Sequence, residues 1–99
     1  MSNVVELASF NLKEGVSLPD FFLASEKFND GFLSKQKGYI SRKLLVNEKT
    51  WLDLVIWETM EDAQNAVKEF CNSDLAHEYG SFMVEDDGEL VHFSVEKSY

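Results

Sequence analysis

The stretch TWLDLVIWETMEDA, residues 50–63, contains a strand, the start of a helix and the connection between them. Branched and aromatic residues fill most of its first eight positions, which is typical of a β-strand. Thr59 then offers a side-chain oxygen for a helix N-cap, and the acidic Asp62 follows three residues later. Apolar residues continue at helical spacing as far as Phe70. We therefore expect a strand over 50–57 that leads directly into a helix.

The sequence before this stretch predicts two more strands and another helix. Residues 39–46 are strand-like, and the short polar segment 47–49 predicts a hairpin between them and the next strand. Residues 4–12 form an earlier strand-like segment. Ser17 is placed to cap a helix whose buried face contains phenylalanines, and Gly38 is placed to end that helix.

The sequence after this stretch completes the pattern. Ser73 is placed to cap a short helix over residues 74–83, and residues 90–95 are expected to form a last strand. This order is the split β-α-β pattern, and 99 residues are enough for one domain. We therefore predict one α+β domain over residues 1–99, with a ferredoxin-like β-α-β-β-α-β fold whose helices cover one face of an antiparallel sheet.

The chain is strongly acidic, with 18 Asp and Glu against 9 Lys and Arg and a formal net charge of −9. Nucleic acids and anionic membranes attract basic surfaces, so we expect neither as a partner. No apolar run approaches the roughly 18 residues that span a bilayer, and the N-terminus has no basic leader. Cys71 is the single cysteine, so we expect no internal disulfide and a cytoplasmic location.

The strand over 50–57 is apolar on both faces, because side chains alternate along a strand. One face carries Leu52, Leu54 and Ile56. The other carries Trp51, Asp53, Val55 and Trp57. Helices cover one face of a ferredoxin-like sheet and leave the other open. We therefore expect a homodimer in which the face with Leu52, Leu54 and Ile56 packs on a second copy.

Residues 38–45 (GYISRKLL) and 51–63 (WLDLVIWETMEDA) resemble the antibiotic biosynthesis monooxygenase-like family. The typical pattern of that family is a glycine, an aromatic residue and a basic strand, followed by a strand that ends in Trp-Glu-Ser/Thr-x-Glu-Asp-Ala. The order of elements agrees along essentially the whole chain. The resemblance implies a dimeric α+β barrel, and it says less about activity because this barrel serves many chemistries.

One branch of the family is similar to cofactor-independent monooxygenases that oxidise anthrone-type polyketides to quinones. The resemblance implies a role there for the Trp at the strand end and for an Asn four residues earlier. Trp57 matches the Trp, whereas Asp53 stands at the Asn position. An amide can donate a hydrogen bond to a substrate oxyanion, but an ionised Asp cannot. Asp53 would therefore have to act protonated or as a base, and no cofactor is expected.

A second branch binds and degrades heme. It uses an Asn on the first strand, a Trp near the end of the second helix and a His on the next helix. Those positions hold Ala8, Phe70 and Gly80 here, and His77 lies about one helical turn before the last of them. Heme binding or degradation is accordingly the less favoured interpretation.

The candidate catalytic residues are Asp53, Trp57 and His77. The candidate pocket-lining residues are aromatic apart from one histidine, and they are Phe10, Phe28, Phe32, Phe70, Phe82 and His92. Each has a structural alternative. Trp57 could simply fill the junction between strand and helix, and both histidines could be structural or surface residues.

Asp53 has an alternative of its own, a pairing with Arg42 or Lys43 on the neighbouring strand. No metal site is expected, because two isolated histidines lack ligand spacing.

Two functions follow from these residues. The first is cofactor-independent oxygenation of a small aromatic or phenolic substrate in an apolar pocket, with Asp53 or a nearby His as the proton acceptor. The alternative is a small-ligand-binding or structural dimer without turnover. Oxygen consumption with a model anthrone separates the two.

Overall fold

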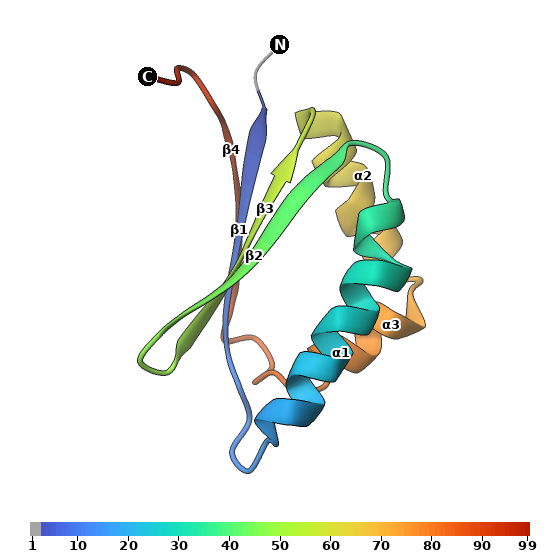
Figure 1. The fold of residues 1–99 in the computed structure, drawn as a ribbon, viewed down its shortest axis with the longest axis vertical. Helices are drawn as coiled ribbons and strands as arrows, with labels where there is room; N and C mark the ends of the chain where they lie inside the picture. Colours follow the sequence, from blue (N-terminus) through green and yellow to red (C-terminus); the bar gives the residue numbers. More distant parts are fainter. Residues whose placement is uncertain (1–2) are drawn as a thin grey trace.

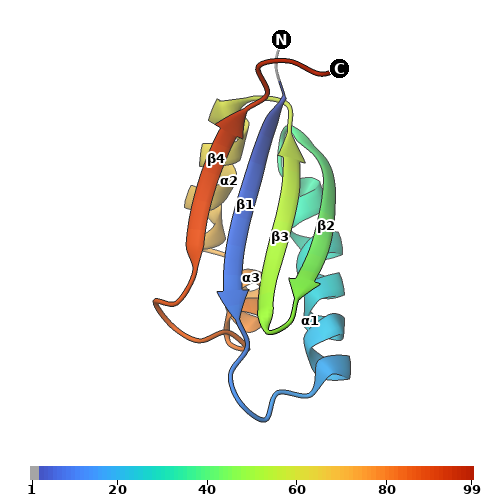
Figure 2. The same ribbon diagram turned by 90° about the vertical axis from the view of Figure 1, so that its left-hand side faces the viewer.

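The computed structural model describes residues 3–99 and contains one four-stranded antiparallel sheet. The strands lie in the order β2-β3-β1-β4, and the helices pack on one side of them (Figures 1 and 2). In chain order the elements are β1 (Val4–Asn11), α1 (Leu18–Gly31), the 3₁₀ turn η1 (Leu33–Lys35), β2 (Tyr39–Asn47), β3 (Thr50–Trp57), α2 (Met60–Phe70), α3 (Asp74–Gly80) and β4 (Glu89–Ser94). The predicted ferredoxin-like α+β fold is confirmed.

All three helices begin at the predicted cap residues. The Oγ of Ser17 accepts from the Asp20 N–H at 3.4 Å, and the Oγ of Ser73 accepts from the Ala76 N–H at 3.2 Å. At the start of α2, Thr59 Oγ1 accepts from the Asp62 N–H at 3.0 Å. Each cap satisfies a backbone donor that has no partner within the helix.

The first helix ends earlier than predicted, at Gly31 instead of near Gly38. Phe32 and Leu33 are both buried, and the change to the tighter η1 turn lets the two consecutive side chains enter the core. Gly38 keeps a left-handed conformation (φ +85°), but it turns the chain into β2. A Cβ at this glycine would collide with Asp62, so the turn also brings β2 close to α2.

The core lies between the helices and the sheet, and it is mainly aromatic. Phe21 and Trp57 are fully enclosed, and Phe28 is 3% exposed. The rings of Phe28 and Tyr79 stack with their centroids 4.8 Å apart. The prediction of a phenylalanine-rich buried face is confirmed for Phe21 and Phe28 of α1 and for Phe32 just after it, which are all buried, whereas Phe22 is 45% exposed.

The opposite face of the sheet has no helix over it (Figure 1). In the register, Leu54 pairs with Leu7 and Ile56 pairs with Val5. On the far strand Phe93, which is 54% exposed, pairs with Val5. A mainly apolar face therefore runs across β2, β3, β1 and β4, and we call it the outer face. Lys43 lies on it opposite Leu54, and its apolar residues are Val5, Leu7, Leu45, Leu52, Leu54, Ile56, Val91 and Phe93. Within residues 3–99, no helix has the length and apolar character needed to cross a membrane.

Candidate functional site

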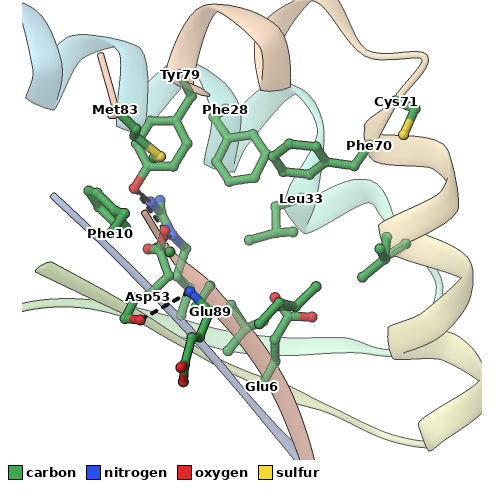
Figure 3. A pocket seen from close by; sticks show the side chains of 18 of the residues that line it. Glu6, Phe10, Phe28, Leu33, Asp53, Phe70, Cys71, Tyr79, Met83 and Glu89 are labelled. Atoms are coloured by element: carbon green, nitrogen blue, oxygen red, sulfur yellow. Dashed lines mark hydrogen bonds and ion pairs between the residues drawn. The ribbon is translucent and has the colours of Figure 1, made fainter. Parts of the chain in front are cut away.

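A cavity of about 370 Å³ lies between the sheet and the helices. Most of its wall is apolar, with contributions from β1, β3, β4 and all three α-helices (Figure 3). The exposed lining residues lie beside β4 and the end of α2, and they mark the opening; they are Cys71, Val84, Gly88, Glu89 and Leu90. A cavity of this size suits a small organic ligand.

Five of the residues singled out from the sequence line this cavity. Asp53 and Trp57 come from β3, where a spacing of four places both on the helix-facing side. The aromatic wall includes Phe10 from β1, Phe28 from α1 and Phe70 from α2. In Figure 3 the rings of Phe28 and Phe70 lie against each other, with centroids 5.4 Å apart.

Two further predicted lining residues lie outside the cavity wall. Phe32 stacks on Phe28 with a centroid distance of 5.7 Å, and Phe82 packs edge-on against Phe21 at 6.0 Å. Neither is among the lining residues. Both rings therefore support the wall from the core behind it, Phe32 from the end of α1 and Phe82 from the segment after α3.

The two histidines have different positions. His77 is exposed on α3, because that helix turns Ala76 and Tyr79 inward. The structure therefore does not bring His77 to the cavity with Asp53 and Trp57. His92 is not a lining residue either, but its ring contacts one that is, Glu6.

Asp53 pairs with Arg42, one of the two alternatives that the sequence leaves open. The Nε of Arg42 donates to Asp53 Oδ1 at 2.8 Å, and the hydroxyl of Tyr79 donates to Asp53 Oδ2 at 2.8 Å. Lys43 cannot replace Arg42, because it pairs with Leu54 and so lies on the outer face. Both oxygens of the carboxylate are therefore engaged within the protein.

Further contacts from α1 and α3 hold this cluster in place. Arg42 also donates to Ser25 Oγ at 2.9 Å and to the Tyr79 hydroxyl at 3.0 Å. Its guanidinium lies 5.3 Å from the centroid of Phe28 and 5.2 Å from that of Tyr79, as in cation–π pairs. Burial raises the pKa of Asp53, while Arg42 and Tyr79 oppose that rise. Burial also raises the pKa of Tyr79, so its hydroxyl keeps its proton and donates.

Glu6 forms a second polar cluster in the cavity wall. It is opposite His92 in the β1–β4 register, and His92 Nε2 lies 2.8 Å from Glu6 Oε1. The two side chains are 11% and 15% exposed, respectively. Burial raises the pKa of Glu6; the hydrogen bond and charge of His92 oppose this, and the charge of Asp53 adds to it.

Sequence reasoning missed Glu6, although one signal could have found it. Along β1 the inward positions are Val4, Glu6, Ala8 and Phe10, so a carboxylate stands in an apolar series. A charge at such a position is rarely buried without a partner or a function. Sequence reasoning also missed Tyr79, because its hydrogen-bond partners Asp53 and Arg42 lie far away in the chain.

Trp57 brings an unused hydrogen-bond donor to the site. Its indole Nε1 is buried and has no hydrogen-bond partner in residues 3–99. It nevertheless lies close enough to Glu6 to lower the pKa of that carboxyl. A buried donor without a partner costs free energy unless a ligand or another group accepts from it. Trp57 thus packs in the core, as its structural alternative expected, with its N–H enclosed near Glu6.

No three His, Cys, Asp or Glu side chains come together to hold a metal ion in the part of the chain that the structure describes.

Solved structures with the same fold include several oxygenases. SnoaB, a cofactor-independent oxygenase from Streptomyces nogalater, superposes with a TM-score of 0.77 over 99% of this chain and 97% of its own, at 13% identity. A candidate antibiotic biosynthesis monooxygenase from Bordetella bronchiseptica gives a TM-score of 0.79 over the whole of both chains, at 16% identity.

A monooxygenase from Streptomyces coelicolor, solved with the ligand nanaomycin D, gives a TM-score of 0.70 over 99% of this chain and 91% of its own, at 10% identity. No family model matches the sequence, and neither does any curated protein. These likenesses show that the chain has the fold of antibiotic biosynthesis monooxygenase-like proteins, as the resemblance implied.

Proposed function

We propose that this protein is a cofactor-independent monooxygenase for a small aromatic substrate with a phenolic or enolic oxygen. The observation that carries the proposal is the cavity itself. It is walled by aromatic rings and holds two buried carboxylates, Glu6 and Asp53, of which Asp53 is paired with the Arg42 guanidinium. The shared fold with SnoaB, which is described as a cofactor-independent oxygenase, adds support.

The chemistry needs a proton acceptor and donors for an oxyanion. A buried carboxylate removes a proton from an activated carbon, and the electron pair stays on the substrate as an enolate. The Arg42 guanidinium, which lines the cavity, stabilises the negative oxygen in a largely apolar environment. The enolate then reduces O₂. In the net reaction a CH₂ group and O₂ become a carbonyl and water, so the substrate supplies all four electrons.

One observation favours the alternative, a small-ligand-binding dimer without turnover. Both Asp53 oxygens accept hydrogen bonds, from Arg42 and Tyr79, so this carboxylate has no free oxygen to accept a proton from a substrate. A pocket built only for binding would need no free base.

Oxygen uptake with a model anthrone separates the two functions. We expect the purified protein to consume oxygen well above the buffer rate, with a quinone as the product. Asp53→Asn introduces the amide that the resemblance implies, so its rate of oxygen uptake shows whether the Asp53 carboxylate promotes or slows the oxygenation. Glu26→Gln, an exposed change on α1, is the matched control and should leave the rate unchanged. The contrary outcome is that the wild type and Asp53→Asn both bind the anthrone but consume oxygen only at the buffer rate. The protein would then be a binder of this compound and not its oxygenase.

We further propose that a second copy covers the outer face in a homodimer. Support comes from its apolar side chains, since Val91 and Phe93 of β4 are 38% and 54% exposed on this face and contiguous apolar surface favours association. A cytoplasmic location belongs to the same proposal, because the free thiol of Cys71 suits a reducing compartment.

A further inference from the structure

We propose that Glu6 is the catalytic base of this cavity and that His92 is the positioning residue that holds it. This inference rests on the proposed function and identifies the proton acceptor that the function requires. It reassigns the role that the sequence suggests for Asp53.

The backbone register places the two residues together. Glu6 and His92 are directly opposite on the antiparallel strands β1 and β4, where side chains on one face are in contact. His92 Nε2 meets Glu6 Oε1 at 2.8 Å, which leaves Oε2 for the cavity that Glu6 lines. An ionised carboxylate has no proton to give, so Nε2 donates in this pair.

Asp53 is poorly suited to the same task. It would have to release the Arg42 Nε–H or the Tyr79 hydroxyl before either oxygen could take a proton. Breaking a buried ion pair leaves a charge without compensation. Asp53 instead holds Arg42 in place beside the cavity.

The proton transfer is balanced at Glu6. The substrate C–H bond breaks, its electron pair stays on carbon as the enolate, and the proton forms an O–H bond on Glu6 Oε2. The neutral carboxyl can keep the hydrogen bond from His92, so the base does not lose its position.

The surroundings of Glu6 favour proton acceptance. From β3 it faces the charge of Asp53, which raises its pKa, and Trp57, which lowers it. The guanidinium of Arg42 from β2 and the exposed carboxylate of Glu89 from β4 line the same cavity. On α2 the lining residues Ala66, Val67 and Phe70 carry no titrating group. Burial raises the pKa of Glu6 above its ordinary value, and a base whose pKa is closer to neutral accepts a proton more readily from a weak carbon acid.

Proton removal can be measured without oxygen. In anaerobic D₂O, loss of the anthrone methylene signal in proton NMR reports carbanion formation alone. We expect wild-type protein to accelerate this exchange, and we expect Glu6→Gln, which keeps the size of the side chain, to lower the acceleration by about 100-fold or more. Asp53→Asn should lose less than Glu6→Gln, and the exposed Glu26→Gln should lose nothing. Circular dichroism and quenching of tryptophan fluorescence by anthrone verify that each variant folds and binds.

The role of His92 has its own readout. Because His92 lowers the pKa of Glu6, its removal should move the pH midpoint of exchange upward. His92→Leu should shift the midpoint most, His92→Gln should shift it less because it retains an N–H donor, and His77→Gln should not shift it. Carbon-13 NMR of the Glu6 carboxyl should show the same order of midpoints in protein without anthrone.

The outcomes separate the two proposals. If the exchange depends on Glu6 but the wild type takes up no oxygen, the oxygenase function is wrong and the assignment of Glu6 as the base stands. Oxygen uptake and exchange that both survive in Glu6→Gln would overturn the base assignment and keep the function. No acceleration by the wild type across the pH range overturns both, and identical midpoints in His92→Leu and His77→Gln remove the positioning role.

Discussion

Arg42 decides the character of the cavity at the level of single residues. Its side chain is 6% exposed and bonds Asp53, Ser25 and Tyr79, so one guanidinium joins β2, β3, α1 and α3. The adjacent Lys43 has the same charge but lies on the opposite face. Position on the strand, rather than charge, determines which of them contributes to the site.

Arg42→Gln should therefore destabilise the fold, whereas Lys43→Gln should not. Removal of one partner from a buried pair leaves the other uncompensated and typically costs about 3 kcal/mol. The exposed lysine should change the free energy of unfolding by less than about 0.5 kcal/mol. Urea denaturation at neutral pH measures both. Equal stability of the two variants would show that the Arg42 pair contributes no more than a surface charge.

At the level of elements, the helix caps and the strand alternation were predictable because both are local. Ser17, Thr59 and Ser73 each bond an amide three residues away, and β3 has the predicted bounds of 50–57. The end of α1 was not predictable, because burial of Phe32 and Leu33 competes with helix continuation. The last helix likewise ends at Gly80, three residues before the predicted end.

The cap of α2 should have a measurable effect on stability. Thr59→Ala removes the acceptor for the Asp62 N–H, and we expect a loss of about 1 kcal/mol in the free energy of unfolding. Thr59→Ser keeps a hydroxyl and should lose much less. Denaturant melts with an unchanged slope would assign the effect to stability rather than to compactness. A full loss in Thr59→Ser would point to the threonine methyl group instead of the hydrogen bond.

At the level of the whole molecule, the outer face is an apolar sheet surface that no helix of the chain covers. Leu54 is near its centre, paired with Leu7 on β1 and Lys43 on β2. The helices already cover the other face of the sheet (Figure 2), so a second chain is the simplest cover for this one.

Leu54→Lys should therefore convert a dimer into a monomer. Lys43 already lies opposite Leu54 on this face, so a second lysine places two like charges at the centre of the contact, where neither is compensated. On the open face of a monomer the change costs little. Sedimentation should show a species of twice 11.4 kDa for the wild type and a single-chain species for the variant, with unchanged circular dichroism. A wild type that sediments as one chain at micromolar concentration excludes the dimer.

The fold, the helix starts and five of the cavity-lining residues could be predicted from sequence patterns alone. Each follows from a local pattern: alternation along a strand, spacing along a helix, or a cap three residues from its partner. Those patterns operate over a few residues, so they can be recognised without tertiary contacts. The pairing of Asp53 with Arg42 was one of two possibilities, and only the strand register chose between them.

Which groups share the site depends on contacts between distant parts of the chain. Glu6 and His92 are 86 residues apart in the chain, and Tyr79 and Asp53 are 26 apart. His77, which is close in sequence to Tyr79, points to solvent because a helix turns neighbouring side chains to different sides. Hydrogen bonds of this kind depend on strand register and helix placement, which arise when the whole core packs. The chemistry of the cavity is therefore a property of the folded chain, built on a framework that local patterns specify.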